Sequence, residues 1–253
     1  MDLGLTGKQA LVTGASKGIG RATARVLAEQ GCAVHLVARD ATALATAARD
    51  ITTATGREAT WSALDLSIGA NIDRLLAAAP RLDILVNNAG AIPAGTLATV
   101  DEQTWRHAWD LKVFGYINLM RRVYADMCGR GGVIINVIGA GGERVSAGYL
   151  AGAGGNAALM GVTRALGGTS TRDGIRVVGI NPGLIETERL VTMHRTRAAN
   201  QLGDAERWQE LLDPDYPPGQ PAHIADMVAF LASPRSGFTT GTIVTIDGGL
   251  CAR

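Results

Sequence analysis

The sequence lacks the features that would place the protein in a membrane, on nucleic acid or around a metal. Its apolar runs stay below membrane-spanning length, and residues 1–8 lack the basic-then-apolar order of a signal peptide. A formal net charge of +1 gives no electrostatic argument for nucleic acid or for an anionic membrane. The 4 histidines are scattered and form no ligand set, so no metal is expected.

Cysteine is also scarce, and the chain has only Cys32, Cys128 and Cys251. These residues are isolated from one another and show no metal-ligand spacing. Their odd number fits a reducing compartment better than a disulfide framework. The sequence therefore predicts a cytoplasmic protein whose thiols are buried or idle.

Glycine, by contrast, is abundant, with 33 residues that cluster where expected strands meet expected helices. Such clusters suit the close approach of backbone to a ligand. The pattern of apolar residues predicts buried strands over 9–13, 32–38, 60–64, 82–86, 133–138, 175–180 and 242–246. It predicts helices over 18–30, 41–54, 72–79, 101–127, 157–172 and 222–232, with Asp101 as an N-cap. This alternation favours a single α/β domain over residues 1–253.

The first expected strand and helix are joined by a glycine-rich loop, Thr13–Gly20, with the sequence TGASKGIG. The glycines permit a tight turn and leave room for a pyrophosphate at the N-terminus of the helix, where the dipole favours anions. A plain glycine turn is the alternative, and it explains the strand–loop–helix context less well. The pattern predicts a dinucleotide site that includes Gly14, Ser16, Lys17, Gly18, Ile19 and Gly20.

Arg39 and Asp40 follow the second expected strand, at the point that distinguishes NAD from NADP. An acidic residue there binds the ribose 2′-hydroxyl of NAD, whereas an arginine accommodates the 2′-phosphate of NADP. Arg39 and Lys17 place two cations around that spot, so we predict that NADP(H) is favoured over NAD(H). Asp40 leaves NAD open, and a solvated Arg39 is the simpler alternative.

Together with this loop, four further segments resemble the motifs of the short-chain dehydrogenase/reductase family. They are Asp65-Leu66, the NNAG sequence Asn87–Gly90, the glycine-rich stretch Gly132–Gly161, and the loop from Asn181 to Thr187. The resemblance covers essentially the whole chain. It implies a Rossmann-like doubly wound parallel sheet with helices on both faces, and a substrate lid over 184–212. It also implies the remaining cofactor contacts, at Asp65, Leu66, Asn88, Ala89, Gly90, Asn156, Pro182, Gly183, Ile185 and Thr187.

The residues that carry catalysis in that family are replaced in this chain. Alignment through Gly142 and 157–159 puts the family's Ser at Gly139, its Tyr at Gly152 and its Lys at Asn156. The family's fourth residue, an Asn in the context D-x-N-x-x-G, falls on Lys112. One ammonium and one amide therefore remain, with their positions exchanged, and the sequence predicts an atypical active site.

Three residues are the candidates for catalysis in this rewritten site. Asn156 is expected to bind the ribose hydroxyls. Lys112, if it points inward, would bring a positive charge to the substrate oxygen, and burial would lower its pKa enough for a base or a Schiff-base nucleophile; a solvated surface lysine is the alternative. Tyr149 lies three residues before Gly152 on roughly the same helical face, so its phenol could enter the space left there. It could equally be a pocket wall or an interface residue.

The resemblance implies an enzyme that transfers a hydride between NADP(H) and a small carbonyl or alcohol substrate. The loss of Ser and Tyr keeps two alternatives open. One is an isomerase, lyase or dehydratase on the same fold, and the other is a non-catalytic cofactor-binding subunit. The helices over 101–127 and 157–172 resemble those that form a four-helix interface in the family, so a homodimer or homotetramer is expected.

Overall fold

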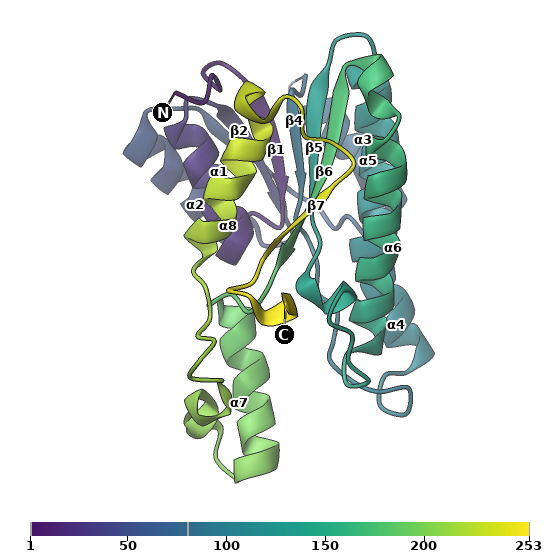
Figure 1. Cartoon of the computed structure of the whole chain (residues 1–253). Coiled ribbons are helices and arrows are strands. Elements are labelled where there is room, and N and C mark those ends of the chain that lie inside the picture. The colour runs from purple at the N-terminus through teal and green to yellow at the C-terminus, as the bar shows by residue number, and fades with distance from the viewer. Residues whose placement is uncertain (1, 80, 253) are drawn as a thin grey trace.

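The computed structural model describes residues 2–79 and 81–252, and in them the chain folds around one parallel sheet (Figure 1). The strands are β1 (Gln9–Thr13), β2 (Ala33–Ala38), β3 (Ala59–Ala63), β4 (Ile84–Asn87), β5 (Gly132–Val137), β6 (Ile175–Pro182) and β7 (Ile243–Ile246). Their order is β3-β2-β1-β4-β5-β6-β7. This order reverses between β1 and β4, and doubly wound sheets bind their ligands at such a point, beyond the carboxyl ends of the strands. The predicted fold class is confirmed.

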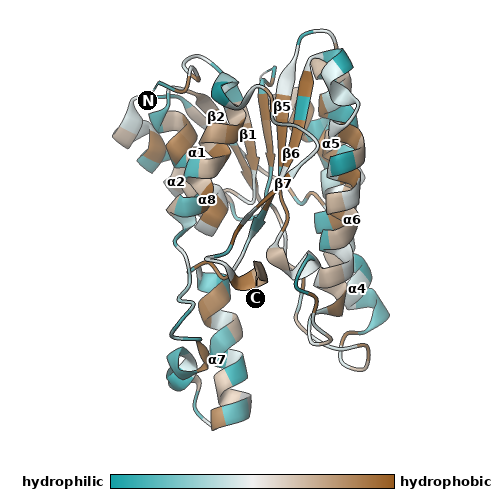
Figure 2. Cartoon of the chain, viewed as in Figure 1, coloured by the Kyte–Doolittle hydropathy of each residue, from teal (hydrophilic) through white to brown (hydrophobic). Residues whose placement is uncertain are grey.

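The central strands form because their apolar runs are buried on both faces of the sheet. In β4 and β6 nearly every residue is buried, whereas β3 and β7 lie at the two edges and are partly exposed. Continuous apolar sequence is typical of parallel strands that are covered by helices on both sides. Figure 2 shows the same pattern, with the strands predominantly hydrophobic between helices of mixed character.

Helices cover both faces of the sheet. One layer holds α1 (Gly18–Glu29), α2 (Ala41–Thr55) and α8 (Pro221–Ala232), which share a buried cluster with β1, β2 and β5. The other layer holds α3 (Gly69–Ala78), α5 (Gly115–Met127) and α6 (Leu150–Gly167), which bury residues such as Leu75, Leu119 and Leu159 (Figure 1). The sheet thus has an apolar core on each side and presents its polar chemistry at the strand ends.

The predicted long helix over 101–127 is found, but its middle contains an irregular turn that the sequence did not reveal. The segment is α4 (Glu102–Trp109), a single π-helical turn over Asp110–Phe114, and α5. Asp101 caps α4 as expected, since its carboxylate accepts a hydrogen bond of 2.7 Å from the backbone N–H of Thr104. π turns are rare and are frequent at functional sites, and this one contains Lys112.

The predicted start of the helix at 157 is also wrong, because α6 begins at Leu150 and ends at Gly167. A 3₁₀ turn over Ser170–Asp173 follows it. The first turns of α6 are rich in glycine, and each glycine disfavours a helix by about 1 kcal/mol relative to alanine. Close packing offsets that cost: the Trp109 indole lies against Gly154 and Gly155, and its N–H donates to the carbonyl of Ala151 at 2.9 Å. Gly152 and Asn156 therefore lie inside the helix.

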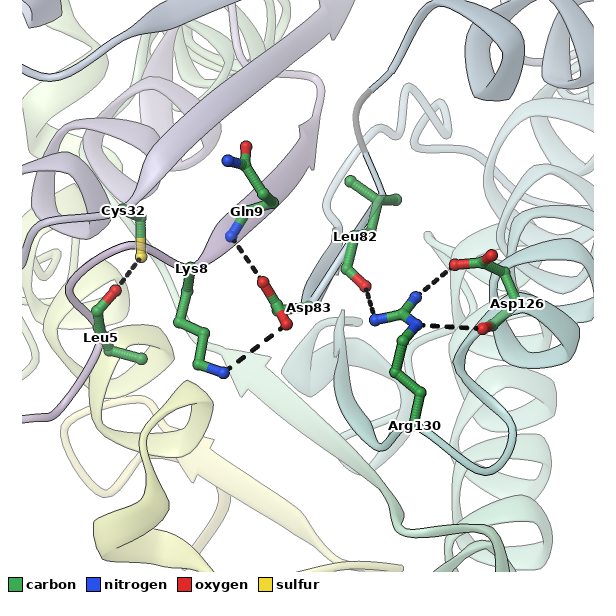
Figure 3. Close-up of polar contacts among 8 residues, drawn as sticks. All are labelled: Leu5, Lys8, Gln9, Cys32, Leu82, Asp83, Asp126 and Arg130. Carbon is green, nitrogen blue, oxygen red and sulfur yellow. Dashed lines mark hydrogen bonds and ion pairs between the residues drawn. The ribbon is translucent and has the colours of Figure 1, made fainter.

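The amino ends of β1 and β4 are tied together at the edge of the sheet opposite the crevice (Figure 3). The Asp83 carboxylate accepts from the backbone N–H of Gln9 at 2.9 Å and lies 3.7 Å from the Lys8 ammonium. Arg130 donates to the carbonyl of Leu82 at 2.8 Å and pairs with Asp126. These contacts join the strands and the neighbouring α5 at the amino ends, at the end of the sheet opposite the candidate site.

The segment predicted as a lid forms α7 (Glu188–Leu202) and a 3₁₀ stretch over Ala205–Leu211. These elements extend away from the body of the fold, past the carboxyl edge of the sheet (Figure 1). The bounds of the domain as 1–253 and of the lid as 184–212 stay predictions; residues 1, 80 and 253 lie outside the described part of the chain. No helix in that part is both long and apolar enough to span a membrane.

Candidate active site and cofactor crevice

The glycine-rich loop and the NNAG segment lie side by side at the point where the strand order reverses. A Cβ at Gly14, where φ is +65°, would stand 2.9 Å from the Cα of Ala89, and a Cβ at Gly20 would overlap the carbonyl of Gly14. The Asn88 side chain donates to the carbonyl of Thr13 at 2.9 Å, and the Thr13 hydroxyl accepts from the N–H of Ala89 at 3.0 Å. The two predicted segments therefore form one wall, in which glycine is required for space.

The N-terminus of α1 meets the start of the lid segment. Lys17 is the N-cap residue of α1, and its ammonium lies 2.8 Å from the Glu188 carboxylate, both side chains being exposed. A Cβ at Gly18 would lie 3.2 Å from the methyl group of Thr187. Thr187 thus lies beside the glycine loop, as the resemblance implies, whereas Lys17 is engaged by a carboxylate that sequence reasoning did not pair with it.

The rim beyond β2 leaves one cation free. The Asp40 carboxylate accepts a hydrogen bond of 3.0 Å from the N–H of Ala43 and caps α2. Arg39 is exposed and has no hydrogen-bond or ion-pair partner among the described residues. Burial acts to raise the pKa of nearby Asp65, but hydrogen bonds from Ser67 and the charge of Arg39 hold that pKa below its usual value. Asp40 is therefore occupied, and Arg39 is available to an anion.

The other predicted cofactor contacts lie at the carboxyl ends of β3 and β6. Leu66 is buried, and its carbonyl would lie 3.2 Å from a Cβ at Gly115 at the start of α5. Pro182 ends β6, and Gly183 packs so closely on Asp247 that a Cβ would approach its Cα to 2.7 Å. Ile185 is buried in the core on the α1 side. Like the glycine loop, these segments lie at the carboxyl ends of parallel strands of one sheet.

Lys112 points inward from the π turn. Its ammonium donates to the carbonyl of Ile138 at 2.5 Å, at the end of β5, and lies 5.8 Å from the centre of the Tyr116 ring. A Cβ at Gly90 would stand 3.0 Å from Cδ of Lys112. The lysine stem therefore runs beside the NNAG segment, and its head lies at the carboxyl edge of the central strands.

The surroundings of Lys112 disfavour its charged form. Burial first, and then the positive charge of Arg189, lower the pKa of Lys112 to about 7. Its ammonium has no carboxylate partner in the described residues. Near neutral pH the neutral amine and the ammonium are both populated, so the group can either accept or donate a proton.

Asn156 and Gly139 lie next to the same strand end. The Asn156 side chain is 2% exposed, and its Oδ1 is buried without a hydrogen-bond partner in the described part of the chain. A Cβ at Gly139 would come within 3.0 Å of Nδ2 of Asn156, and the φ of +139° would strain any side chain there. Lys112 and Asn156 thus flank the Ile138–Gly139 segment, and the Asn156 amide retains a hydrogen-bond valence that a ligand can use.

Tyr149 fills the space above Gly152. It precedes the first turn of α6, and a Cβ at Gly152 would overlap the carbons of its ring. The same ring would lie 3.1 Å from a Cβ at Gly141, so it is held between two glycines. Its hydroxyl has no hydrogen-bond partner among the described residues. This packing suits a pocket wall as well as a proton donor, and both interpretations stay open.

Arg189 in the first turn of α7 is the site residue that the sequence did not reveal. It donates to the carbonyl of Gly90 at 3.0 Å and to that of Ile92 at 2.5 Å. In the sequence it is one of several arginines that nearby acids balance, a pattern typical of a solvated helix. The available signal was its position, two residues after Thr187.

Comparison with known sequences gives one consistent result. The family described as enoyl-(acyl carrier protein) reductase matches residues 14–251. A cis-4-hydroxycyclohexanecarboxylate dehydrogenase of Sinomonas cyclohexanicum is 35% identical over 259 residues, covering 96% of this chain and 96% of that protein. A 3-oxoacyl-acyl-carrier-protein reductase of Chlamydia trachomatis is 32% identical over 251 residues, covering 97% and 98%.

Comparison with solved structures agrees. L-sorbose reductase from Gluconobacter frateurii, in a complex with NADPH and L-sorbose, aligns with a TM-score of 0.92 at 30% identity. The alignment covers 100% of both chains. The similarity therefore includes the sheet, the helices and the extension that carries α7.

Proposed function

Because the chain belongs to the short-chain dehydrogenase/reductase family, we propose that it is an NADP(H)-dependent oxidoreductase whose catalytic groups are Lys112, Tyr149 and Asn156. Its substrate would be a small carbonyl compound or alcohol. The relatives named above are dehydrogenases and reductases, which favours redox chemistry over an isomerase, a lyase, a dehydratase or a non-catalytic subunit.

The residues at the carboxyl ends of the strands favour a nicotinamide dinucleotide, which when bound would supply or accept the hydride. The backbone of the glycine loop would hold the pyrophosphate at the N-terminus of α1. The NNAG segment packs against this loop so closely that a side chain at position 14 or 20 would overlap it. Arg39 would bind the 2′-phosphate, since Asp40 is committed to its helix cap. The unpartnered Oδ1 of Asn156 would accept a hydrogen bond from a ribose hydroxyl.

Lys112 would move the proton on the substrate oxygen. In the oxidation of an alcohol the neutral amine accepts the hydroxyl proton, and in the reduction of a carbonyl the ammonium donates one. A pKa of about 7 lets Lys112 do either near neutral pH. This part-buried amine, which has no carboxylate partner among the described residues and lies at the strand end beside Asn156, is the single observation that carries the proposal.

Tyr149 would be the second group near the substrate oxygen. The family's tyrosine position is Gly152, and the Tyr149 ring occupies the volume that a side chain there would need. Its hydroxyl is free to bond a ligand, because no described residue engages it. The ring and the glycine are therefore complementary in shape.

The test is turnover of a panel of carbonyls and alcohols with NADPH or NADP, followed by nicotinamide absorbance, and by substrate mass for non-redox conversion. Lys112→Met should lower kcat by about 10²–10⁴-fold, the usual contribution of general acid–base catalysis, and leave cofactor affinity nearly unchanged. Lys8→Met is the matched control, since Lys8 lies at the opposite edge of the sheet and should tolerate the change. Full activity of Lys112→Met would exclude the proposed role.

Tyr149→Phe separates the acid from the pocket wall, because it keeps the ring and removes only the hydroxyl. A fall in kcat with an unchanged melting temperature supports the catalytic role; an unchanged kcat assigns Tyr149 to packing.

Asn156→Ala should instead weaken cofactor binding, which calorimetric titration with NADPH measures.

A further inference from the structure

Gly90 connects the lysine of the proposed site to the helix that extends over it. One side of its Cα faces the Lys112 stem, where a Cβ would lie 3.0 Å from Cδ and 3.5 Å from Nζ. Its carbonyl accepts the hydrogen bond of 3.0 Å from Arg189. A single residue of the β4 loop therefore separates the two cations.

Arg189 holds the first turn of α7 against that loop. Its guanidinium bonds the carbonyls of Gly90 and Ile92, at 3.0 and 2.5 Å, and the planar group suits such a paired contact. Farther along α7, Arg195 pairs with Glu206, and Arg197 bonds Gln201 in the next turn of the same helix. Arg189 thus joins α7 to the loop after β4, whereas the described partners of Arg195 and Arg197 lie within 188–211.

The described groups that interact with Lys112 come from several elements, and among them Arg189 carries a charge of the same sign. Ile138 offers a carbonyl from β5, and Gly90 offers backbone from the loop after β4. Tyr116 on α5 is a neutral phenol, since burial raises its pKa and its hydroxyl donates to the carbonyl of Val137. Arg189 is the remaining neighbour, and its charge opposes an ammonium on Lys112. No described carboxylate offsets that repulsion.

We propose that Arg189 is a positioning residue that couples docking of α7 to loss of the proton from Lys112. With α7 docked, the guanidinium next to Gly90 favours the neutral amine; with α7 away, that repulsion is removed and the ammonium is favoured more than before. Linkage is reciprocal, so protonated Lys112 weakens the docking of α7 by the same factor. The coupling itself does not require catalysis by Lys112. It rests on the proposed function only for the statement that the Lys112 proton takes part in the reaction.

The state of Lys112 can be read without activity, because the chain has only three lysines, Lys8, Lys17 and Lys112. Protein labelled with ¹³C and ¹⁵N lysine gives three side-chain signals, which single substitutions assign and a pH titration by NMR follows. Arg189→Met should raise the pKa of Lys112, and Arg189→Lys should retain part of the lowering. Arg197→Met, the matched control on the same helix, should leave that pKa unchanged.

The position of the helix gives a second, independent readout. After correction for the intrinsic pH dependence of amide exchange, the protection of 188–202 against hydrogen exchange should be lower below the pKa of Lys112 than above it, by up to about tenfold for each pH unit by which docking lowers that pKa. Lys112→Met should remove this pH dependence, and Arg189→Met should make exchange fast at every pH. Arg189→Gln, which keeps a hydrogen-bond donor without charge, should slow exchange again but leave the pKa of Lys112 high.

An unchanged Lys112 pKa in Arg189→Met would overturn the coupling. So would exchange in 188–202 that shows the same pH dependence in Lys112→Met as in the unmodified protein. The proposed function fails separately: if Lys112→Met is fully active while the Lys112 pKa still responds to Arg189→Met, the coupling stands and the catalytic role does not. If Lys112→Met is inactive while that pKa ignores Arg189, the reverse holds.

Discussion

At the scale of single residues, the proposed site contains pairs in which a glycine makes room for a candidate functional side chain. Gly90 leaves space for the Lys112 stem, and Gly152 leaves space for the Tyr149 ring. At Gly139 a φ of +139° and the nearby Asn156 amide both oppose a side chain. Restoring one family residue alone, such as Gly139→Ser, would therefore strain the loop without rebuilding the usual site.

Lys112 should give protein stability a specific dependence on pH. Its pKa is lowered from 10.5 to about 7, so between these values the unfolded state binds a proton that the folded state does not. Unfolding free energy should therefore rise with pH across this window. Urea denaturation at about pH 7 and pH 10 measures the rise, and Lys112→Met should reduce it. If the unfolding free energy rises equally with pH in the unmodified protein and in Lys112→Met, the Lys112 ammonium is well solvated in the folded state.

The cofactor preference depends on which charges at the rim are free. Arg39 has no hydrogen-bond or ion-pair partner among the described residues, whereas Lys17 is paired with Glu188, so we expect Arg39 to supply most of the preference for NADP(H). Arg39→Ala should bring the dissociation constants of NADPH and NADH together. Glu188→Gln should release Lys17 and tighten NADPH about 2–5-fold, because an exposed ion pair contributes about 1 kcal/mol or less. Titration of both cofactors decides this, and tighter binding of NADH by the unmodified protein would contradict it.

At the scale of elements, the sequence predicted what periodicity and glycine placement control. The strand Gln9–Thr13 and the start of α2 at Ala41 are found where expected, because a buried apolar run and a capping carboxylate are local signals. The π turn over Asp110–Phe114 was missed, since one turn of i→i+5 hydrogen bonds within a longer helix leaves too short a pattern in the sequence to be recognised. The early start of α6 was missed because its Gly-rich first turns are stabilised by the distant Trp109.

The same reasoning explains which part of the candidate site was foreseen. The glycine loop and the NNAG segment follow from motifs whose residues serve backbone geometry. The inward direction of Lys112 depends on the π turn, and the contact of Arg189 with Gly90 joins residues 99 positions apart. Sequence patterns carry no record of such a contact, so Arg189 could be recognised only in three dimensions.

The packing of α6 on the π turn predicts opposite effects for two glycines of one helix. A Cβ at Gly161 would meet nothing within 4 Å, so Gly161→Ala should stabilise the protein by about 0.5–1 kcal/mol through helix propensity. A Cβ at Gly155 would lie 3.2 Å from Val113 and 3.3 Å from the Trp109 indole nitrogen. Gly155→Ala should gain less or destabilise, and Gly155→Val should destabilise clearly. Chemical denaturation compares them; a stabilised Gly155→Val would show that the interface is loose.

At the scale of the whole molecule, the outer surface of α4 and the π turn remains to be explained. A groove of about 530 Å³ there is lined by Glu102, Trp105, Arg106, Trp109, Asp110 and Phe114. Phe114, the last residue of the π turn that contains Lys112, is 51% exposed although its side chain is large and apolar. The long helical segment that holds this groove is one of the two expected to form an interface between subunits.

We therefore expect a homodimer or homotetramer in which this surface is buried. Phe114→Glu should shift the protein toward a smaller species, because a buried charge without a partner opposes association. Light scattering at micromolar concentration measures the mass, and Phe238→Glu is the control, since Phe238 is fully exposed on another part of the chain. If the unmodified protein is a monomer, the expected assembly is wrong. If Phe114→Glu keeps the original mass, the interface lies elsewhere. Loss of association together with altered titration of Lys112 would show that assembly supports the π turn, two residues from the exposed ring.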